Sequence, residues 1–160
     1  MRILIVSDTH RENSIYLKLV EQWAPLDMVI HCGDVEGSEY TISGAVKCPT
    51  VIVQGNNDFF TDLPKERQIK IGHHQVLVTH GHYYYVATAG HRVLVKEARE
   101  RKIDIVMYGH THRPVIEKED GVLVINPGSL TYPRQSNRKS SYIIMETNQE
   151  DDPVFQIHYI

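Results

Sequence analysis

Cysteines are scarce in this chain of 160 residues, which contains only Cys32 and Cys48. Two cysteines cannot supply the several bridges that staple small secreted folds, and free thiols are typical of a reducing compartment. Long apolar runs are lacking too, since the first of them, Ile3 to Val6, gives way at once to polar residues. Such a run is too short for the core of a signal peptide or for a membrane span. We therefore expect a cytoplasmic protein that has no membrane partner.

A large excess of positive charge is lacking as well. The 17 basic and 20 acidic side chains leave a formal net charge of −3 at pH 7. A general electrostatic grip on nucleic acid needs a basic surface, so we expect no strong general nucleic-acid binding. The sequence has no linker, low-complexity stretch or clear repeat, and its length suits a single domain spanning residues 1–160. One residue type is unusually frequent, because the chain has ten histidines.

A short apolar run followed directly by a cluster of polar, metal-capable residues recurs along the chain. Short runs rich in β-branched residues and bounded by glycine and polar residues are typical of strands that are buried on both faces. The sequence therefore predicts strands at Ile3–Val6, Met28–Ile30, Val51–Val53, Val76–Val78, Ile105–Met107 and Val122–Ile125.

Helices are predicted between several of these strands. Apolar residues at helical spacing from Tyr16 to Trp23 indicate one amphipathic helix, and Asn13 suits its N-cap position. A second helix is expected between Gly90 and Lys102, where Glu97 and Arg101 are spaced to form an i,i+4 ion pair. Alternation of strand and helix implies parallel pairing with right-handed crossovers.

The last part of the chain has a strand pattern without helical periodicity. No helical pattern follows Tyr108, and further strands are expected at Val115–Lys118, Tyr142–Glu146 and Val154–Tyr159. We therefore predict an α/β fold in which two sheets pack together and helices lie outside them.

The polar clusters should converge, because the carboxyl ends of parallel strands lie along one edge of a sheet. Imidazole with carboxylate suits Zn, Mn, Fe or Ni, and the number of groups exceeds what one tetrahedral ion needs. With one bridging carboxylate they would give each of two ions four protein contacts, an arrangement used for displacement at phosphorus. The candidate ligands are Asp8, His10, Asp34, Asn56, His80, His110 and His112.

These clusters, taken in order, resemble the signature blocks of the calcineurin-like metallophosphoesterase superfamily. The compact length makes the chain most similar to small YfcE-type phosphodiesterases and to the related retromer subunit. The resemblance extends from Asp8 to Ser129. It rests on Asp8-Thr9-His10, Gly33-Asp34, Gly55-Asn56, His80-Gly81-His82, Gly109-His110-Thr111-His112 and the closing Ile125-Asn126-Pro127-Gly128-Ser129.

The resemblance implies a four-layer α-β-β-α sandwich of two mixed sheets flanked by helices. It also implies a phosphoesterase in which a hydroxide that bridges two divalent ions attacks phosphorus in line with the leaving group, without a separate protein base. Its ligand pattern assigns the first ion to Asp8, His10 and His112, the second to Asn56, His80 and His110, and the bridging position to Asp34.

One position departs from the family pattern. Many members have Gly-Asn-His-Asp in the third block, where the histidine helps to expel the leaving group, whereas this chain has Gly55-Asn56-Asn57-Asp58. Asn57 can donate a hydrogen bond to charge but cannot deliver a proton. We therefore expect weak general-acid assistance and a preference for phosphodiesters with activated leaving groups. His82 is an alternative acid if it faces the leaving oxygen, and Asp58 is expected either to support a ligand or to cap local backbone.

Substrate, metal and partners are less tightly constrained. Small phosphodiester or nucleotide-like substrates are expected, and Arg11 is a candidate contact for their phosphate, with a solvated arginine as the alternative. Manganese is the first choice of metal, with Fe, Ni, Zn or Co also compatible with the ligand set. The resemblance makes a homodimer or a higher homo-oligomer an open alternative to a monomer. A second hypothesis is a non-catalytic metal-binding scaffold resembling the retromer subunit.

Overall fold

Two five-stranded mixed sheets form the centre of the molecule in a computed structural model that describes residues 1–148 and 152–160. The first sheet has the order β10-β9-β1-β2-β3, in which β1 pairs with β2 and β2 with β3 in parallel, while β9 is antiparallel to both β1 and β10. Its strands are β1 (Arg2–Val6), β2 (Met28–His31), β3 (Thr50–Ile52), β9 (Ser141–Thr147) and β10 (Pro153–Tyr159).

The second sheet has the order β4-β5-β6-β8-β7. Its three central strands β5, β6 and β8 run parallel, and the edge strands β4 and β7 pair antiparallel with β5 and β8. These strands are β4 (Glu66–Ile71), β5 (His74–Thr79), β6 (Ile105–Met107), β7 (Pro114–Glu119) and β8 (Val122–Pro127).

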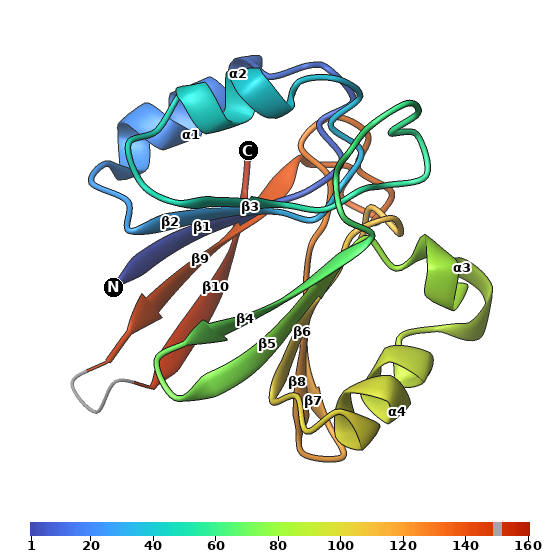
Figure 1. Ribbon diagram of the computed structural model, residues 1–160. Coiled ribbons are helices and arrows are strands. Elements are labelled where there is room, and N and C mark those ends of the chain that lie inside the picture. The colour runs from blue at the N-terminus through green and yellow to red at the C-terminus, as the bar shows by residue number, and fades with distance from the viewer. Residues whose placement is uncertain (149–151) are drawn as a thin grey trace.

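Helices cover the outer faces of the two sheets, as Figure 1 shows. Helices α1 (Ser14–Trp23) and α2 (Glu39–Gly44) lie on the first sheet, and α3 (Val86–Ala89) and α4 (Arg92–Glu100) lie beside the second, after a short 3-10 turn η1 (His82–Tyr84). The predicted four-layer α-β-β-α sandwich is therefore confirmed. None of the described helices is long and apolar enough to cross a membrane.

Burial on both faces explains why the strands have continuous apolar runs. In β1, Ile3 and Ile5 point into the core between the sheets, whereas Leu4 and Val6 pack toward α1 and α2. Side chains alternate between the faces of a strand, so a sheet covered on both sides needs apolar residues at every position. A third cluster joins α4 to the second sheet, with Leu94 fully buried at its centre.

Most predicted elements are confirmed, with shifts at their ends. The stripe from Tyr16 to Trp23 lies in α1, and Asn13 occupies the N-cap position but its side chain makes no capping hydrogen bond. The second predicted helix is shorter than expected, since α4 begins only at Arg92, and the Arg101 guanidinium lies 3.5 Å from Glu97 as expected. After Tyr108 the described residues contain strands but no helix.

The strand β4 and the helix α2 are not predicted by the sequence patterns. β4 is an edge strand whose sequence, Glu-Arg-Gln-Ile-Lys-Ile, has only two apolar residues, because much of its surface faces solvent. α2 has six residues and buries only Ile42, which is too little periodicity to recognise. Tertiary pairing and packing create both elements where local preference is weak.

Candidate metal centre

The loops that follow the parallel strands meet at one end of the sandwich. Asp8 follows β1, Asp34 follows β2, and His80 follows β5 of the other sheet. The backbone of several candidate ligands is left-handed, a conformation that is uncommon outside glycine and that clusters at functional sites. Positive φ angles between 46° and 66° occur at Asp8, His10, Asp34, His110 and His112.

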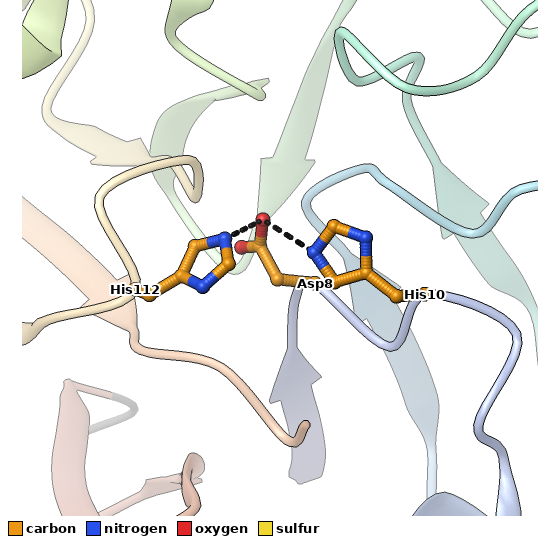
Figure 2. Close-up of side chains that lie close together, drawn as sticks. All are labelled: Asp8, His10 and His112. Atoms are coloured by element: carbon orange, nitrogen blue, oxygen red, sulfur yellow. Dashed lines mark ion pairs between the residues drawn. The ribbon is translucent and has the colours of Figure 1, made fainter. Parts of the chain in front are cut away.

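A first group of three side chains surrounds one oxygen of Asp8. Figure 2 shows the Asp8 carboxylate between the imidazoles of His10 and His112. Asp8 Oδ1 lies 3.0 Å from His112 Nε2 and 3.9 Å from His10 Nε2. One ligand atom from each residue lies within 4.8 Å of the others, as binding of one ion requires.

A second group adds Asp34 and His80 to Asp8. His80 Nε2 lies 3.5 Å from Asp34 Oδ2 and 3.9 Å from Asp8 Oδ1, and these three groups also lie within 4.8 Å of one another. Asp34 Oδ2 lies 3.9 Å from His10 Nε2 as well, so this oxygen lies between the two groups. Asp8, Asp34 and His80 are all essentially inaccessible to solvent.

Three of the imidazoles are held in the same way. Nδ1 of His80 lies 2.7 Å from the carbonyl oxygen of Cys32, and Nδ1 of His112 lies 2.7 Å from that of Tyr132. Nδ1 of His10 lies 2.7 Å from a carboxylate oxygen of Glu36. These oxygens can only accept, so in each case Nδ1–H donates and, in a neutral ring, Nε2 has a lone pair directed at the carboxylates.

A lone pair facing a carboxylate is repulsive unless a cation or a proton lies between them. Within the described residues, His10 Nε2 and Asp8 Oδ1 are buried and neither makes a well-aligned hydrogen bond, although His112 Nε2 lies 3.0 Å from Asp8 Oδ1. Buried polar atoms of this kind are costly unless they are neutralised by a ligand. The donor set of imidazole and carboxylate therefore fits divalent transition-metal ions.

Burial and neighbouring charges shift the pKa values of several groups in this cluster. Burial opposes ionisation of Asp8, but His80 and His112 outweigh it and lower the pKa of this carboxyl to about 2. Burial alone would lower the pKa of His112, but the Asp8 carboxylate outweighs burial and raises this pKa above its usual value. Burial and the neighbouring His80 lower the pKa of His110, and the pKa of His82 falls to about 4 for the same reasons.

Asn57 and Asp58 organise the loop around Asp34. The Asn57 backbone N–H and side-chain amide donate to the two oxygens of Asp34, at 2.8 and 2.7 Å. The buried Asp58 carboxylate accepts from the backbone N–H groups of Asp34, Glu36 and Gly55, at 2.6 to 2.8 Å. Asp58 therefore caps backbone, which was one of the two roles expected for it.

Two loops approach each other so closely here that one position needs glycine. A Cβ atom built on Gly55 would lie 2.1 Å from Asp34 Oδ1 and 2.4 Å from the Asp34 backbone nitrogen. The loop after β3 can therefore lie against the loop after β2 only because Gly55 has no side chain.

The remaining predicted residues lie around this cluster. Asn56 is exposed, with Oδ1 at 3.1 Å from His80 Nε2. The His110 ring centre lies 5.1 Å from that of His80, and the His110 backbone N–H donates to Asp8 Oδ2. The His82 ring lies 5.3 Å from the His80 ring. The Arg11 side chain is 76% exposed and donates to the backbone oxygen of Glu36.

Glu36 and Tyr132 also contact the cluster, although neither is among the predicted site residues. The Tyr132 ring lies 5.1 Å from the His10 ring, and its carbonyl oxygen holds His112. Nothing in the sequence near Tyr132 indicates this contact. Glu36 carries a weak signal, because it follows Asp34 at the same two-residue spacing as His10 follows Asp8.

The chain resembles known proteins over most of its length. Residues 1–150 match the calcineurin-like phosphoesterase superfamily domain. The probable metallophosphoesterase YsnB of Bacillus subtilis is 36% identical over 146 residues, which cover 91% of this chain and 83% of that protein. A phosphodiesterase of Methanocaldococcus jannaschii is 32% identical over 146 residues, covering 80% of this chain and 83% of that protein.

Solved structures show the same architecture. A predicted phosphoesterase from Streptococcus pneumoniae superposes with a TM-score of 0.83 at 27% identity, covering 99% of this chain and 88% of that one. Vps29 from Entamoeba histolytica, at 22% identity, shares the fold with a TM-score of 0.79 over 100% of this chain and 99% of its own. Since the domain match spans residues 1–150 and the relatives are named metallophosphoesterases, this chain belongs to the calcineurin-like phosphoesterase superfamily and is a phosphoesterase by class.

Proposed function

We propose that this protein is a two-metal phosphodiesterase that acts on small phosphodiester or nucleotide-like substrates. The observation that carries the proposal is the set of three anchored imidazoles whose Nε2 atoms face two buried carboxylates. When bound, two divalent ions would polarise the phosphoryl oxygens and lower the pKa of a water for in-line attack. Manganese is the proposed metal, with Fe, Ni, Zn and Co as alternatives.

The residues have distinct proposed roles. Asp8, His10 and His112 would hold the first ion, and Asn56, His80 and His110 the second, with Asp34 shared between them. The distances of 3.5 and 3.9 Å from Asp34 Oδ2 to His80 Nε2 and to His10 Nε2 support the shared role.

A preference for activated leaving groups is supported by the chemistry of Asn57. Its amide can hold Asp34 and donate to negative charge, but it cannot protonate a leaving group. Substrates whose leaving groups need little protonation should therefore react fastest, and p-nitrophenyl esters have this property. The choice of diesters is supported separately by the Methanocaldococcus jannaschii relative, which is named a phosphodiesterase.

The test uses chelator-stripped protein. Hydrolysis of bis-p-nitrophenyl phosphate is compared with that of p-nitrophenyl phosphate, with and without added Mn²⁺. We expect metal-dependent turnover that favours the diester. A preference for the monoester would overturn the diesterase assignment, and no turnover with any of the candidate metals, in folded and metal-loaded protein, would favour the scaffold hypothesis.

Replacing the shared ligand tests the two-ion arrangement without relying on turnover. In Asp34→Ala, we expect cooperative binding of two Mn²⁺ ions to be lost, because no carboxylate remains to couple them. Isothermal titration calorimetry measures the stoichiometry, and Asp62→Ala, at an exposed loop position, is the matched control. Full stoichiometry in Asp34→Ala would show that this residue does not bridge.

A further inference from the structure

A second cluster of imidazole and carboxylate groups lies away from the metal centre. His73 and His74 lie at the turn between β4 and β5, and Asp152 directly precedes β10. Figure 1 shows the β4–β5 and β9–β10 hairpins at the opposite end of the sandwich from the loops that form the metal centre. β5 itself spans this distance, because it begins at His74 and is followed by His80, six residues or about 20 Å further on.

The three side chains are close enough to share an ion. One ligand atom from each lies within 4.8 Å of the other two, and His73 Nε2 lies 3.9 Å from Asp152 Oδ1. The two imidazole rings pack at 4.0 Å between centres with 38° between their planes. Each hairpin supplies part of the set, so the cluster exists only in the folded chain.

Backbone structure holds these residues in position. Ile71 pairs with His74, which leaves a two-residue turn of Gly72 and His73, and Gly72 adopts the left-handed φ of +57° that such turns need. On the other hairpin, the Asp152 N–H donates to Asn148 Oδ1, and the Asn148 N–H donates to the Asp152 carbonyl oxygen.

An unpaired ring nitrogen of His74 indicates that the cluster binds a ligand. His74 Nε2 is buried and has no hydrogen-bond partner within the described residues. A buried polar atom that remains unpaired is unfavourable, and the residue that carries this one belongs to the cluster with His73 and Asp152. A cation shared by the three groups would satisfy it.

We propose that His73, His74 and Asp152 form a second, non-catalytic metal site that binds one Zn²⁺-like ion. Two imidazoles and one carboxylate match the ligand preference of zinc, nickel, cobalt or copper, and are a poor match for magnesium or calcium. Water would complete the coordination, since the two outer side chains are 63% and 52% exposed. The ion would join a hairpin of one sheet to a hairpin of the other and would stabilise the native state by mass action.

The test counts bound zinc in the whole protein. Chelator-stripped wild type, His73→Gln and Asp152→Asn are dialysed against the same buffered Zn²⁺ and analysed by mass spectrometry of the metal. Both replaced side chains are exposed, so the variants should fold, and Mn²⁺-dependent hydrolysis should stay at the wild-type rate. Asp120→Asn makes the same chemical change in the turn between β7 and β8 and is the matched control.

We expect wild type and Asp120→Asn to bind one molar equivalent more than His73→Gln and Asp152→Asn. Zinc should also raise the melting temperature of wild type more than that of these two variants. Equal zinc content in all four proteins would overturn the proposal, as would an equal loss in Asp120→Asn, which would indicate a general effect of surface charge. Because the result is a difference between proteins with the same metal centre, it does not depend on the function proposed for that centre.

Discussion

Three imidazoles of the metal centre are held through Nδ1, and the acceptor of His10 is the only side chain among their three partners. This acceptor, the Glu36 carboxylate, is carried on a loop in which the Glu36 backbone N–H donates to the Asp58 carboxylate. Carboxylates in this position fix the orientation of a ligand ring and raise its basicity. In the proposed metal centre, Glu36 would therefore tune metal affinity without touching the ion.

We expect Glu36→Gln to weaken binding of the first ion by about 10- to 100-fold, because a neutral amide is a poorer partner for the His10 N–H. Titration of the stripped protein with Mn²⁺, followed by calorimetry, measures this change. Glu21→Gln, at an exposed position of α1, should bind as wild type does. Unchanged affinity in Glu36→Gln would show that the His10–Glu36 bond has only a structural role.

Asn57→His tests whether the missing proton donor limits the reaction. Histidine can supply both a hydrogen bond and a proton, so we expect faster turnover of phenyl esters, with a gain of at most about 10²- to 10⁴-fold. Esters with a p-nitrophenyl leaving group should gain little. Asn57→Ala is the control for loss of the 2.7 Å contact with Asp34. An unchanged rate on phenyl esters would assign proton delivery to another group.

At the scale of secondary-structure elements, the centre depends on how the loops after β2 and β3 approach each other. Gly55→Ala should disturb both loops, because the new methyl group would overlap the Asp34 side chain and backbone. We expect a loss of stability of about 1–3 kcal/mol together with weaker Mn²⁺ binding. Urea unfolding and metal titration measure the two effects.

Gly44→Ala provides the matched comparison. Gly44 lies in α2, and a Cβ atom there would have nothing within 4 Å. Alanine should stabilise this helix by up to about 1 kcal/mol and leave metal binding unchanged. If Gly55→Ala behaved in the same way, the close approach of the two loops would not matter for the centre.

For the whole molecule, three apolar clusters join four layers, and the core between the sheets takes residues from both of them. We therefore predict that residues 1–160 unfold as one cooperative unit. Leu94→Ala removes a fully buried side chain between α4 and the second sheet and should cost about 2–5 kcal/mol.

The single tryptophan makes this prediction measurable. Trp23 lies in α1 beside the first sheet, where its indole N–H donates to the Tyr142 hydroxyl. In urea, the transition reported by Trp23 fluorescence should shift in Leu94→Ala by as much as the transition reported by circular dichroism. If the midpoint reported by Trp23 fluorescence did not change in Leu94→Ala, the two halves of the sandwich would unfold separately.

The parallel strands, two of the helices and the candidate ligands can all be predicted from residue patterns along the chain. Apolar runs such as Ile3–Val6 are continuous because both faces of the sheet are covered, and such runs can be recognised in the sequence. Polar residues that follow such runs lie at one edge of a parallel sheet. The sequence therefore predicts that Asp8, Asp34 and His80 lie close together.

The groups that surround those candidate ligands come from contacts between distant parts of the fold. The Cys32 and Tyr132 carbonyl oxygens, which direct His80 and His112, are backbone atoms that every residue has, so no sequence pattern indicates them. The edge strand β4 forms because β5 offers hydrogen bonds, and the cluster of His73, His74 and Asp152 forms because two hairpins far apart in the chain meet. Contacts of this kind depend on pairing and packing between distant segments, and local residue preference does not encode them.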